Sequence, residues 1–365
     1  MNLSTLNAGL IFKSLFISFL ISILTSVLAT KLAIRTDLLD RPNSEPHKLH
    51  KHPVPVSGGT AMFSALLILL LIFRNSISRP LWGLAASAFV IYLFALRDDY
   101  KALNWKVKLA GQILGAGILI LTGTRTHLFD SPLFSSLLPA DLCVLCDIGL
   151  TLFWVVFITN AYNLVDSADG LMIGLSAWAE GFFIIAAMDS GQYDMALFCS
   201  ILLGSSLALS FFNSYPAFLF MGDSGAQTIG FLLSAIAIIY TPAELLLKNT
   251  WFLPILLLGV PIFDTVLVTI SRWRRGEHFY HSGTDHTFHR LLKMGLSSHQ
   301  ASAFMHLVCF ALQSLSFFAI SQSVIEANLI FAVVVAVGIG AIIFFEREDL
   351  WEIVKKFIQI NERLS

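Results

Sequence analysis

The stretch LTLFWVVFITNAYNLVDSADGL, residues 150–171, joins a long apolar run to a group of amides and carboxylates. The apolar part is typical of a membrane-spanning helix. The polar part contains Asn160, Asn163, Asp166 and Asp169 at intervals of three residues. Polar and ionisable side chains are costly to bury in a bilayer, so in membrane proteins they usually mark a binding site or a pathway. The stretch therefore predicts a membrane-spanning helix with a polar site at its end.

The whole chain has the composition of a membrane protein. Of its 365 residues, 56% are hydrophobic and only 13% are charged, whereas soluble proteins contain about 25% charged residues. We predict an all-α polytopic membrane protein with residues 1–345 as a single transmembrane domain and residues 346–365 as a cytoplasmic amphipathic tail. A bilayer core takes about 20 apolar residues per helix, and about eleven such spans are expected. They lie at 8–33, 57–73, 80–96, 105–123, 148–162, 170–188, 195–212, 223–240, 250–271, 298–320 and 325–345.

Basic residues are distributed unevenly between the loops that connect these spans. Most lysines and arginines outside the spans lie in one alternating set of loops. The other set has only Arg74, Arg79, Arg125 and Lys248. Because cytoplasmic loops carry the excess of Lys and Arg, we predict an N-terminus outside the cell and a cytoplasmic C-terminus.

This topology, assigned from Lys and Arg alone, sends the acidic and histidine-rich stretches to the cytoplasmic side as well. In RDDY, the adjacent carboxylates of Asp98 and Asp99 repel each other unless a divalent cation or basic groups offset them. A solvated loop start is the alternative interpretation of this pair. For Asn160 to Asp169, the alternative to a ligand site is helix capping, with Asp169 as the N-cap before Gly170.

A second acidic motif, FLFMGDSGAQTIGF, directly precedes a predicted span. Gly222 and Gly225 flank Asp223 and Ser224, and glycine permits close backbone approach, while N–H groups at a helix N-terminus attract phosphate. Asp223 would then offer a carboxylate to Mg²⁺ beside that anion. Helix capping by the same residues is the alternative.

The richest charged loop follows the span predicted at 250–271. Its segment SRWRRG, residues 271–276, contains three arginines, and His286, His289 and Arg290 follow. Such groups can hold phosphate oxygens by charge-assisted hydrogen bonds. Zinc binding by the histidines is the alternative, although the Asp-rich partners favour Mg²⁺. Carboxylates for a hard metal and basic groups for phosphates, both at a membrane, predict phosphoryl transfer to or from a lipid.

The order of five motifs resembles that of a known family of membrane enzymes. DRPN…HKLHKHPVPVSGG, RDDY, NAYNLVDSADGL, FMGDSGA and DHTFHRLL resemble the polyprenyl-phosphate N-acetylhexosamine-1-phosphate transferases of the glycosyltransferase 4 family. That family includes undecaprenyl-phosphate N-acetylglucosamine-1-phosphate transferases and phospho-N-acetylmuramoyl-pentapeptide transferases. The resemblance spans nearly the whole chain.

The resemblance implies a reaction, a cofactor and a location. A multi-pass enzyme of the bacterial plasma membrane would transfer HexNAc-1-phosphate, most simply GlcNAc-1-phosphate, from UDP-HexNAc to undecaprenyl phosphate at the cytoplasmic face. UMP would be released, and the product would start a cell-envelope polysaccharide such as lipopolysaccharide, O-antigen or teichoic acid. Mg²⁺ would be the cofactor, with Mn²⁺ as its substitute. We expect no nucleic-acid partner, and the oligomeric state is left open between monomer and homodimer.

The resemblance also implies roles for individual residues. Asp98 would engage or deprotonate the lipid phosphate, with Asp99 supporting it or the metal, and Asp223 would be the main Mg²⁺ ligand. Phe220 would stack on the uracil ring. The remaining nucleotide-sugar contacts would be Lys48, Asn160, Asn163, Asp166 and Asp169, and the pyrophosphate or sugar contacts would be His286, His289 and Arg290.

The sequence departs from the family pattern at two places. Phe288 stands where many N-acetylglucosamine-type members have a third histidine, and the triple-histidine run of the muramoyl-pentapeptide enzymes is missing. This argues against the peptidoglycan donor and leaves the exact UDP-sugar open. In the first cytoplasmic loop, EPHK replaces the more usual Arg-Lys pair near Lys48.

Two mechanistic and functional alternatives accompany this interpretation. Direct in-line attack by the lipid phosphate is favoured, because a phosphate oxygen is already a competent nucleophile, and double displacement through Asp98 is the alternative. The rival from another class is a cation-coupled transporter, which predicts polar groups near the middle of spans and often an internal repeat. The carboxylates of the motifs named above fall at span ends on one side instead.

Overall fold

The computed structural model describes residues 3–42, 52–131, 134, 136–240, 251–278, 283–351 and 355. Among them, eight helices are long and apolar enough to cross a membrane. The predicted all-α polytopic membrane protein is therefore confirmed. The chain separates into two compact units, Met1–Leu247 and Lys248–Ser365.

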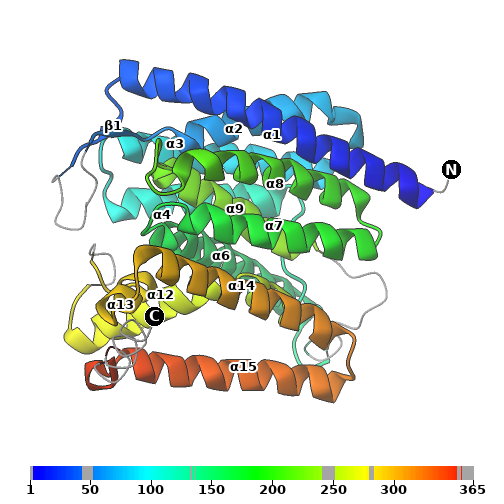
Figure 1. Ribbon diagram of the computed structural model, residues 1–365. Helices are drawn as coiled ribbons and strands as arrows, with labels where there is room; N and C mark the ends of the chain where they lie inside the picture. The colour runs from blue at the N-terminus through cyan, green and yellow to red at the C-terminus, as the bar shows by residue number, and fades with distance from the viewer. Residues whose placement is uncertain are drawn as a thin grey trace. The chain divides into compact units, whose positions relative to one another are not determined.

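The first unit contains most of the helices and the single short hairpin of the described residues (Figure 1). Its elements are α1 (Leu3–Arg35), β1 (Leu39–Asp40), β2 (Val54–Pro55), α2 (Gly58–Ile72), the 3₁₀ turn η1 (Arg74–Ser76), α3 (Arg79–Tyr100), α4 (Trp105–Leu121), α6 (Ala140–Val165), α7 (Leu171–Asp189), α8 (Tyr193–Asn213) and α9 (Gly222–Ile239). The second unit contains α11 (Leu253–Leu257), α12 (Gly259–Arg275), α13 (Thr287–Lys293), α14 (Ser298–Ile320) and α15 (Val324–Phe345).

Three of the predicted spans take a different form from single long helices. The span predicted at 57–73 is α2, with 15 residues, and that at 105–123 is α4, with 17 residues. At 1.5 Å per residue both are shorter than the roughly 30 Å of a bilayer core. The span predicted at 250–271 is divided into α11 and α12. The number of eleven spans and the orientation of the termini stay predictions.

A proline explains the break between α11 and α12. Pro261 has no N–H group, so it cannot donate to the carbonyl of Leu257 one turn earlier, and its ring crowds that carbonyl. The buried side chain of Gln313 on α14 supplies the missing donor, with its Nε2 at 2.9 Å from the Leu257 carbonyl oxygen. A polar side chain inside an apolar helix thus satisfies the carbonyl that the proline leaves free.

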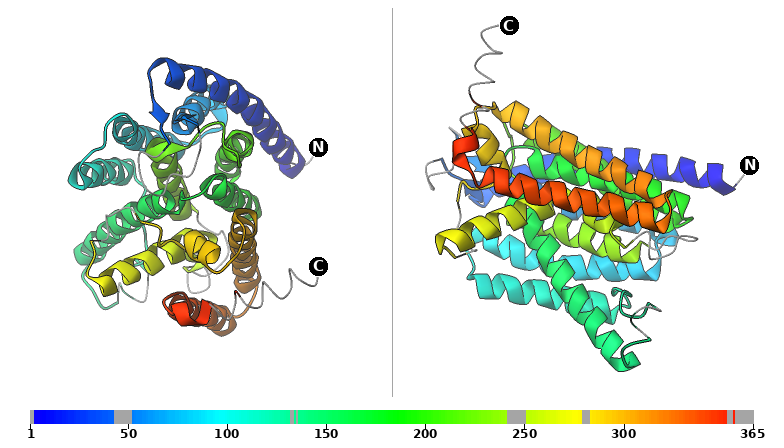
Figure 2. Two further views of the ribbon diagram at one scale, coloured as in Figure 1. Left: turned by 60° about the vertical axis from the view of Figure 1, so that its left-hand side comes forward. Right: turned by 90° about the horizontal axis from the view of Figure 1, so that it is seen from below.

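Serines hold α1 against α8, which also lies beside α7 (Figures 1 and 2). Ser18 and Ser22 of α1 both contact Ser205 of α8, at 3.0 and 2.9 Å between their hydroxyl oxygens. At Gly204 a side chain would collide with the Leu15 carbonyl. Small and hydroxylated residues therefore allow close helix packing in this unit, as they do in membrane bundles generally.

The start of α9 is fixed by the hairpin and by α2. β1 pairs antiparallel with β2, and Val56 just after β2 bridges to Phe220. Phe220 donates its N–H to the Pro55 carbonyl at 2.9 Å, and Gly58 donates back to the Phe220 carbonyl at 3.0 Å. A side chain at Gly59 would collide with Ser224, so α2 approaches α9 closely. These contacts place the FMGD segment against α2 and the hairpin.

Candidate functional site

The two residues of the acidic pair at the end of α3 have different surroundings. Asp99 accepts hydrogen bonds from the backbone N–H groups of Asp223, at 2.7 Å, and Ser224, at 3.1 Å. Each of its oxygens therefore caps the N-terminus of α9, where unpaired N–H groups favour an anion. Gly222 makes this approach feasible, because its φ of +67° suits glycine and a Cβ there would lie 2.8 Å from the Asp99 carboxylate. Asp99 thus fixes Asp223 beside it.

Asp98 and Asp223 share a single lysine. Lys108 of α4 forms ion pairs with both carboxylates, at 2.8 Å to Asp223. Asp98 also accepts the backbone N–H of Leu103 at 2.6 Å. The Asp98 side chain is only 7% exposed, whereas that of Asp223 is 28% exposed. Asp223 is therefore the carboxylate of the pair that a ligand can reach more readily.

A row of amides extends from Asp223 to the end of α6. Gln227, one turn into α9, donates to Asp223 at 3.2 Å and accepts from Gln112 at 3.1 Å. Gln112 accepts from Asn160 at 2.8 Å. The predicted nucleotide contact Asn160 is thus joined to the acidic cluster through two glutamines, because its amide faces α4 and α9.

The remaining polar residues of the 160–169 stretch lie around the turn after α6. Within the described residues, Asn163 and Asp166 make no hydrogen bonds through their side chains, and both are half-buried. Asp169 accepts from the backbone N–H of Ala217 at 3.2 Å. The alternative that Asp169 caps α7 is wrong: Gly170, with φ of +73°, is the N-cap, and the Asp169 carboxylate is directed to the loop before α9.

The charges of the acidic cluster affect the pKa of Asp166, in the turn after α6. Burial, together with the neighbouring charges of Asp223, Asp169 and Asp99, raises the pKa of Asp166 to about 7. Of the carboxyl groups in this cluster, Asp98 and Asp223 contact Lys108. Within the described residues, the cluster therefore contains more carboxyl groups than lysine partners.

The residues of this cluster fit a Mg²⁺ ion that completes its coordination with substrate. Among the described residues, no group of three or more His, Cys, Asp or Glu side chains is arranged to hold a metal ion. Mg²⁺, however, is commonly bound by one or two carboxylates together with substrate phosphates. Asp98 and Asp223 both contact Lys108, so two carboxyl groups share one cation. The metal roles predicted for Asp223 and Asp99 stay predictions, as does the stacking role of the half-buried Phe220.

In the second unit, His286 is held by a carboxylate that the sequence analysis did not select. His286 is the N-cap residue of α13, and its Nδ1 lies 2.8 Å from Asp264 of α12. Asp264 also accepts the backbone N–H of Thr287 at 2.6 Å. His289 follows three residues later, with its ring centre 5.9 Å from that of His286.

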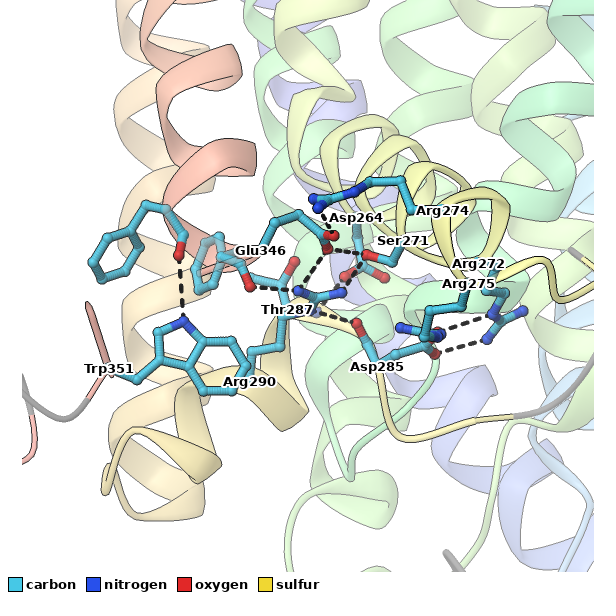
Figure 3. Close-up of polar contacts among 12 residues, drawn as sticks. Asp264, Ser271, Arg272, Arg274, Arg275, Asp285, Thr287, Arg290, Glu346 and Trp351 are labelled. Carbon is cyan, nitrogen blue, oxygen red and sulfur yellow. Dashed lines mark hydrogen bonds and ion pairs between the residues drawn. The ribbon is translucent and has the colours of Figure 1, made fainter. Parts of the chain in front are cut away.

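Arg290, predicted to bind phosphate, is buried in a network of internal acceptors (Figure 3). Its guanidinium donates to the carbonyl oxygens of Asp285, at 2.8 Å, and Phe345, at 2.5 Å. It also donates to the Glu346 carboxylate at 3.0 Å and to the Ser271 hydroxyl. Arg290 therefore ties α12, α13 and the end of α15 together, and its phosphate contact stays a prediction.

The arginines of α12 are paired as well. Arg272 donates to Asp285 through Nε at 3.0 Å and Nη2 at 2.8 Å, and Arg275 reaches the same carboxylate at 2.7 Å. Burial opposes ionisation of Asp285, but these two arginines outweigh it and hold the pKa of Asp285 below its usual range. These arginines border an open cavity of about 630 Å³, which is lined by basic, acidic and uncharged residues. The lining residues are Arg272, Arg275, Gly276, Glu277, His278, Gly283, Thr284, Asp285 and Lys293.

Several residues of these clusters were missed by the sequence analysis, and one prediction cannot be placed. Lys108 was counted only as a basic loop residue, although its position ten residues after Asp98 at the start of an apolar helix was a usable signal. Asp264 lies inside an apolar run that was assigned to a span. Lys48 lies outside the described residues, as does most of the predicted tail.

Comparisons with known proteins agree with these features. A family model described as Glycosyl transferase family 4 matches residues 81–241. The chain is 29% identical over 278 residues to a probable undecaprenyl-phosphate N-acetylglucosaminyl 1-phosphate transferase of Bacillus subtilis, covering 76% of each chain. It is 28% identical to an undecaprenyl-phosphate alpha-N-acetylglucosaminyl 1-phosphate transferase of Yersinia pestis, covering 82% of this chain and 80% of the relative. It is 32% identical to a phospho-N-acetylmuramoyl-pentapeptide-transferase of Geobacillus kaustophilus, covering 58% of this chain and 68% of the relative.

Proposed function

The chain belongs to glycosyl transferase family 4, and we propose that it transfers a HexNAc-1-phosphate group from a UDP-sugar to undecaprenyl phosphate. GlcNAc-1-phosphate is the group proposed first, because relatives covering three quarters or more of this chain are named for it. An oxygen of the lipid phosphate forms a bond to the sugar-linked phosphorus of the donor. The bond from that phosphorus to the bridging oxygen breaks, and UMP leaves.

The observation that carries this proposal is the excess of carboxylates around Lys108. Asp98, Asp99 and Asp223 meet at the start of α9, inside the segment that the family model matches. An arrangement with more anions than cations is unfavourable by itself and favours a cationic ligand. Mg²⁺ held by Asp223, with support from Asp99, would neutralise the pyrophosphate and the departing UMP.

The chain's own residues would bind and orient the two substrates. Asp98 is held by Lys108 and by the Leu103 N–H, so it can accept a proton or a hydrogen bond from the lipid phosphate at a fixed position. The side chains of Asn163 and Asp166 make no hydrogen bonds among the described residues, and they are proposed to contact the nucleotide. Direct attack by the lipid phosphate is preferred to a phosphorylated Asp98.

The proposal includes a location. The site would lie on the cytoplasmic face of the bacterial plasma membrane, with the N-terminus outside and the C-terminus inside, because the basic loops lie on that side. The product would start a cell-envelope polysaccharide. The second candidate donor class is another UDP-sugar in the same reaction.

The test is release of UMP by protein purified in detergent. Undecaprenyl phosphate, Mg²⁺ and one UDP-sugar at a time are supplied, and each of the three is left out in turn. We expect UMP release with UDP-GlcNAc only when lipid and metal are both present, and a loss of this activity in Asp223→Asn and Asp98→Asn. UMP release with Mn²⁺ in place of Mg²⁺ tests whether Mn²⁺ can serve as the cofactor.

Three outcomes would revise the proposal. Activity with a different UDP-sugar would keep the reaction and correct the donor. A folded protein that releases no UMP with any donor would contradict the transferase proposal. Trapping a phosphorylated Asp98 would replace direct attack by double displacement.

A further inference from the structure

Asp264 is an isolated carboxylate within an apolar part of α12, PIFDTVLV, residues 261–268. It is 1% exposed. A buried carboxylate is costly unless its oxygens receive hydrogen bonds. Both oxygens of Asp264 receive them from one place: Oδ2 lies 2.8 Å from Nδ1 of His286, and Oδ1 lies 2.6 Å from the Thr287 N–H. The carboxylate therefore fixes both the ring and the backbone where α13 begins.

The pairing with Asp264 determines which ring nitrogen of His286 remains available. An ionised carboxylate has no proton to give, so Nδ1 must carry the hydrogen of this contact. The His286 ring makes no other hydrogen bond within the part of the chain that the structure describes. Nε2 is then the free nitrogen, an acceptor in the neutral ring and a donor in the imidazolium.

The other charged groups near His286 do not compete for its ring. Asp285, the preceding residue, is engaged by Arg272 and Arg275. Arg290, one turn after His286, is engaged by Glu346 and two backbone carbonyls. Each of these charges has its own internal partner. Asp264 alone, among the described residues, orients the His286 ring.

We propose that Asp264 is a positioning residue that holds His286 by Nδ1, so that Nε2 contacts a phosphate oxygen of a nucleoside diphosphate sugar. This inference rests on the proposed function, and it deepens that function by assigning one atom of the basic loop to the donor. Outer-shell carboxylates of this kind fix the tautomer and the orientation of a histidine.

A double-mutant cycle tests whether Asp264 acts through His286. Asp264→Asn, His286→Asn and the double variant are compared by UMP release at low and high UDP-sugar concentrations. We expect each single change to lower kcat/KM by about 10- to 100-fold and the double variant to be no worse than His286→Asn alone. Independent losses that multiply in the double variant would overturn the proposal.

The neighbouring Thr265 provides a matched control. It is also buried in α12, and its hydroxyl donates only to the Pro261 carbonyl within the same helix. Thr265→Val should therefore leave kcat/KM within about twofold. A loss as large as that of Asp264→Asn would show that any change at this level of α12 disturbs the enzyme, which would contradict a specific role through His286.

A second readout, the protonation of the His286 ring, needs no folded Asp264 variant. Protein labelled with ¹⁵N-histidine is examined in detergent, and His286→Asn assigns the His286 signals by their disappearance. We expect a protonated Nδ1 in the wild type. An unprotonated Nδ1 in a wild type that releases UMP would overturn the positioning role alone. A protonated Nδ1 in a protein that releases no UMP would instead overturn the proposed function.

Discussion

The two units each contain a buried polar cluster, but the clusters balance their charges differently. In the first unit, Asp98 and Asp223 share Lys108, and Asp99 is satisfied by backbone N–H groups. In the second unit, each arginine around α13 has an internal carboxylate partner: Arg272 and Arg275 contact Asp285, and Arg274 and Arg290 contact Glu346.

This difference separates a site that needs a ligand from a framework that does not. Arginines that already have carboxylate and carbonyl acceptors inside the protein need no ligand, and their contacts hold neighbouring elements in place. Unmatched carboxylates are destabilising until a cation or a proton offsets them. The acidic cluster should therefore govern chemistry and metal dependence, whereas the arginine network should govern stability.

The largest effect is expected from neutralising the acidic cluster. Asp223→Asn and Asp98→Asn should each lower kcat for UMP release by about 10³-fold, since groups that stabilise developing charge contribute at this level. The exposed Asp141, at the first turn of α6, is the control. Asp141→Asn should retain wild-type activity, and an equal loss in that variant would refute a specific role for the cluster.

Breaking the arginine network should act on stability instead. Glu346→Met leaves the buried Arg290 guanidinium without its carboxylate, and such changes cost about 3–5 kcal/mol, whereas Arg290→Met leaves Glu346 paired with Arg274. The double variant should recover much of that loss in a thermal melt in detergent, because the charges disappear together. If Arg290 chiefly contacts phosphate, the double variant would instead be stable and as inactive as Arg290→Met.

Removal of the shared lysine should destabilise the acidic cluster and make its stability more dependent on Mg²⁺. Lys108→Met leaves Asp98 and Asp223 without their cation. In EDTA we expect the free energy of unfolding to fall by about 1–3 kcal/mol. Added Mg²⁺ should then raise the melting temperature more in this variant than in the wild type, because more charge is left to offset. Equal shifts would show that the metal binds away from these carboxylates.

The smallest effect concerns the pH dependence of stability. The pKa of Asp166 is raised to about 7 in the folded chain, whereas an unfolded chain would have about 4. The stability that Asp166 contributes is therefore fully present below about pH 4 and is lost as the pH rises through 7. Asp166→Asn should melt a few degrees higher than the wild type at pH 8 and equally at low pH. A constant difference across this range would contradict the shift.

Hydropathy and motif order predicted much of the architecture and the location of the acidic cluster. Long apolar runs gave recognisable helices, and Asp98, Asp99 and Asp223 do meet in the first unit. Sequence could not reveal which oxygen of Asp99 caps which N–H, because that depends on how α3 packs against α9. The pairing of Lys108 with Asp98 and Asp223 depends on the packing of α4 near α3 and α9, which the sequence does not show.

The basic loop was less predictable for a related reason. Arg290 and the arginines of α12 looked available for phosphate in the sequence, but three-dimensional packing supplies them with Asp285, Glu346 and backbone carbonyls. Asp264 was hidden because an apolar run conceals a single buried carboxylate. The break at Pro261 was hidden as well, since hydropathy averages over it.

The pairing of Gln313 with the Leu257 carbonyl has a consequence for engineering. A scheme that improves membrane proteins by replacing polar residues with leucine would select Gln313, which is fully buried in an apolar helix. That substitution would leave the carbonyl next to Pro261 without a donor, so the more lipophilic sequence would yield the less stable protein. Replacing Pro261 first would make the same change harmless, and the order in which the two substitutions are introduced would decide whether each intermediate survives.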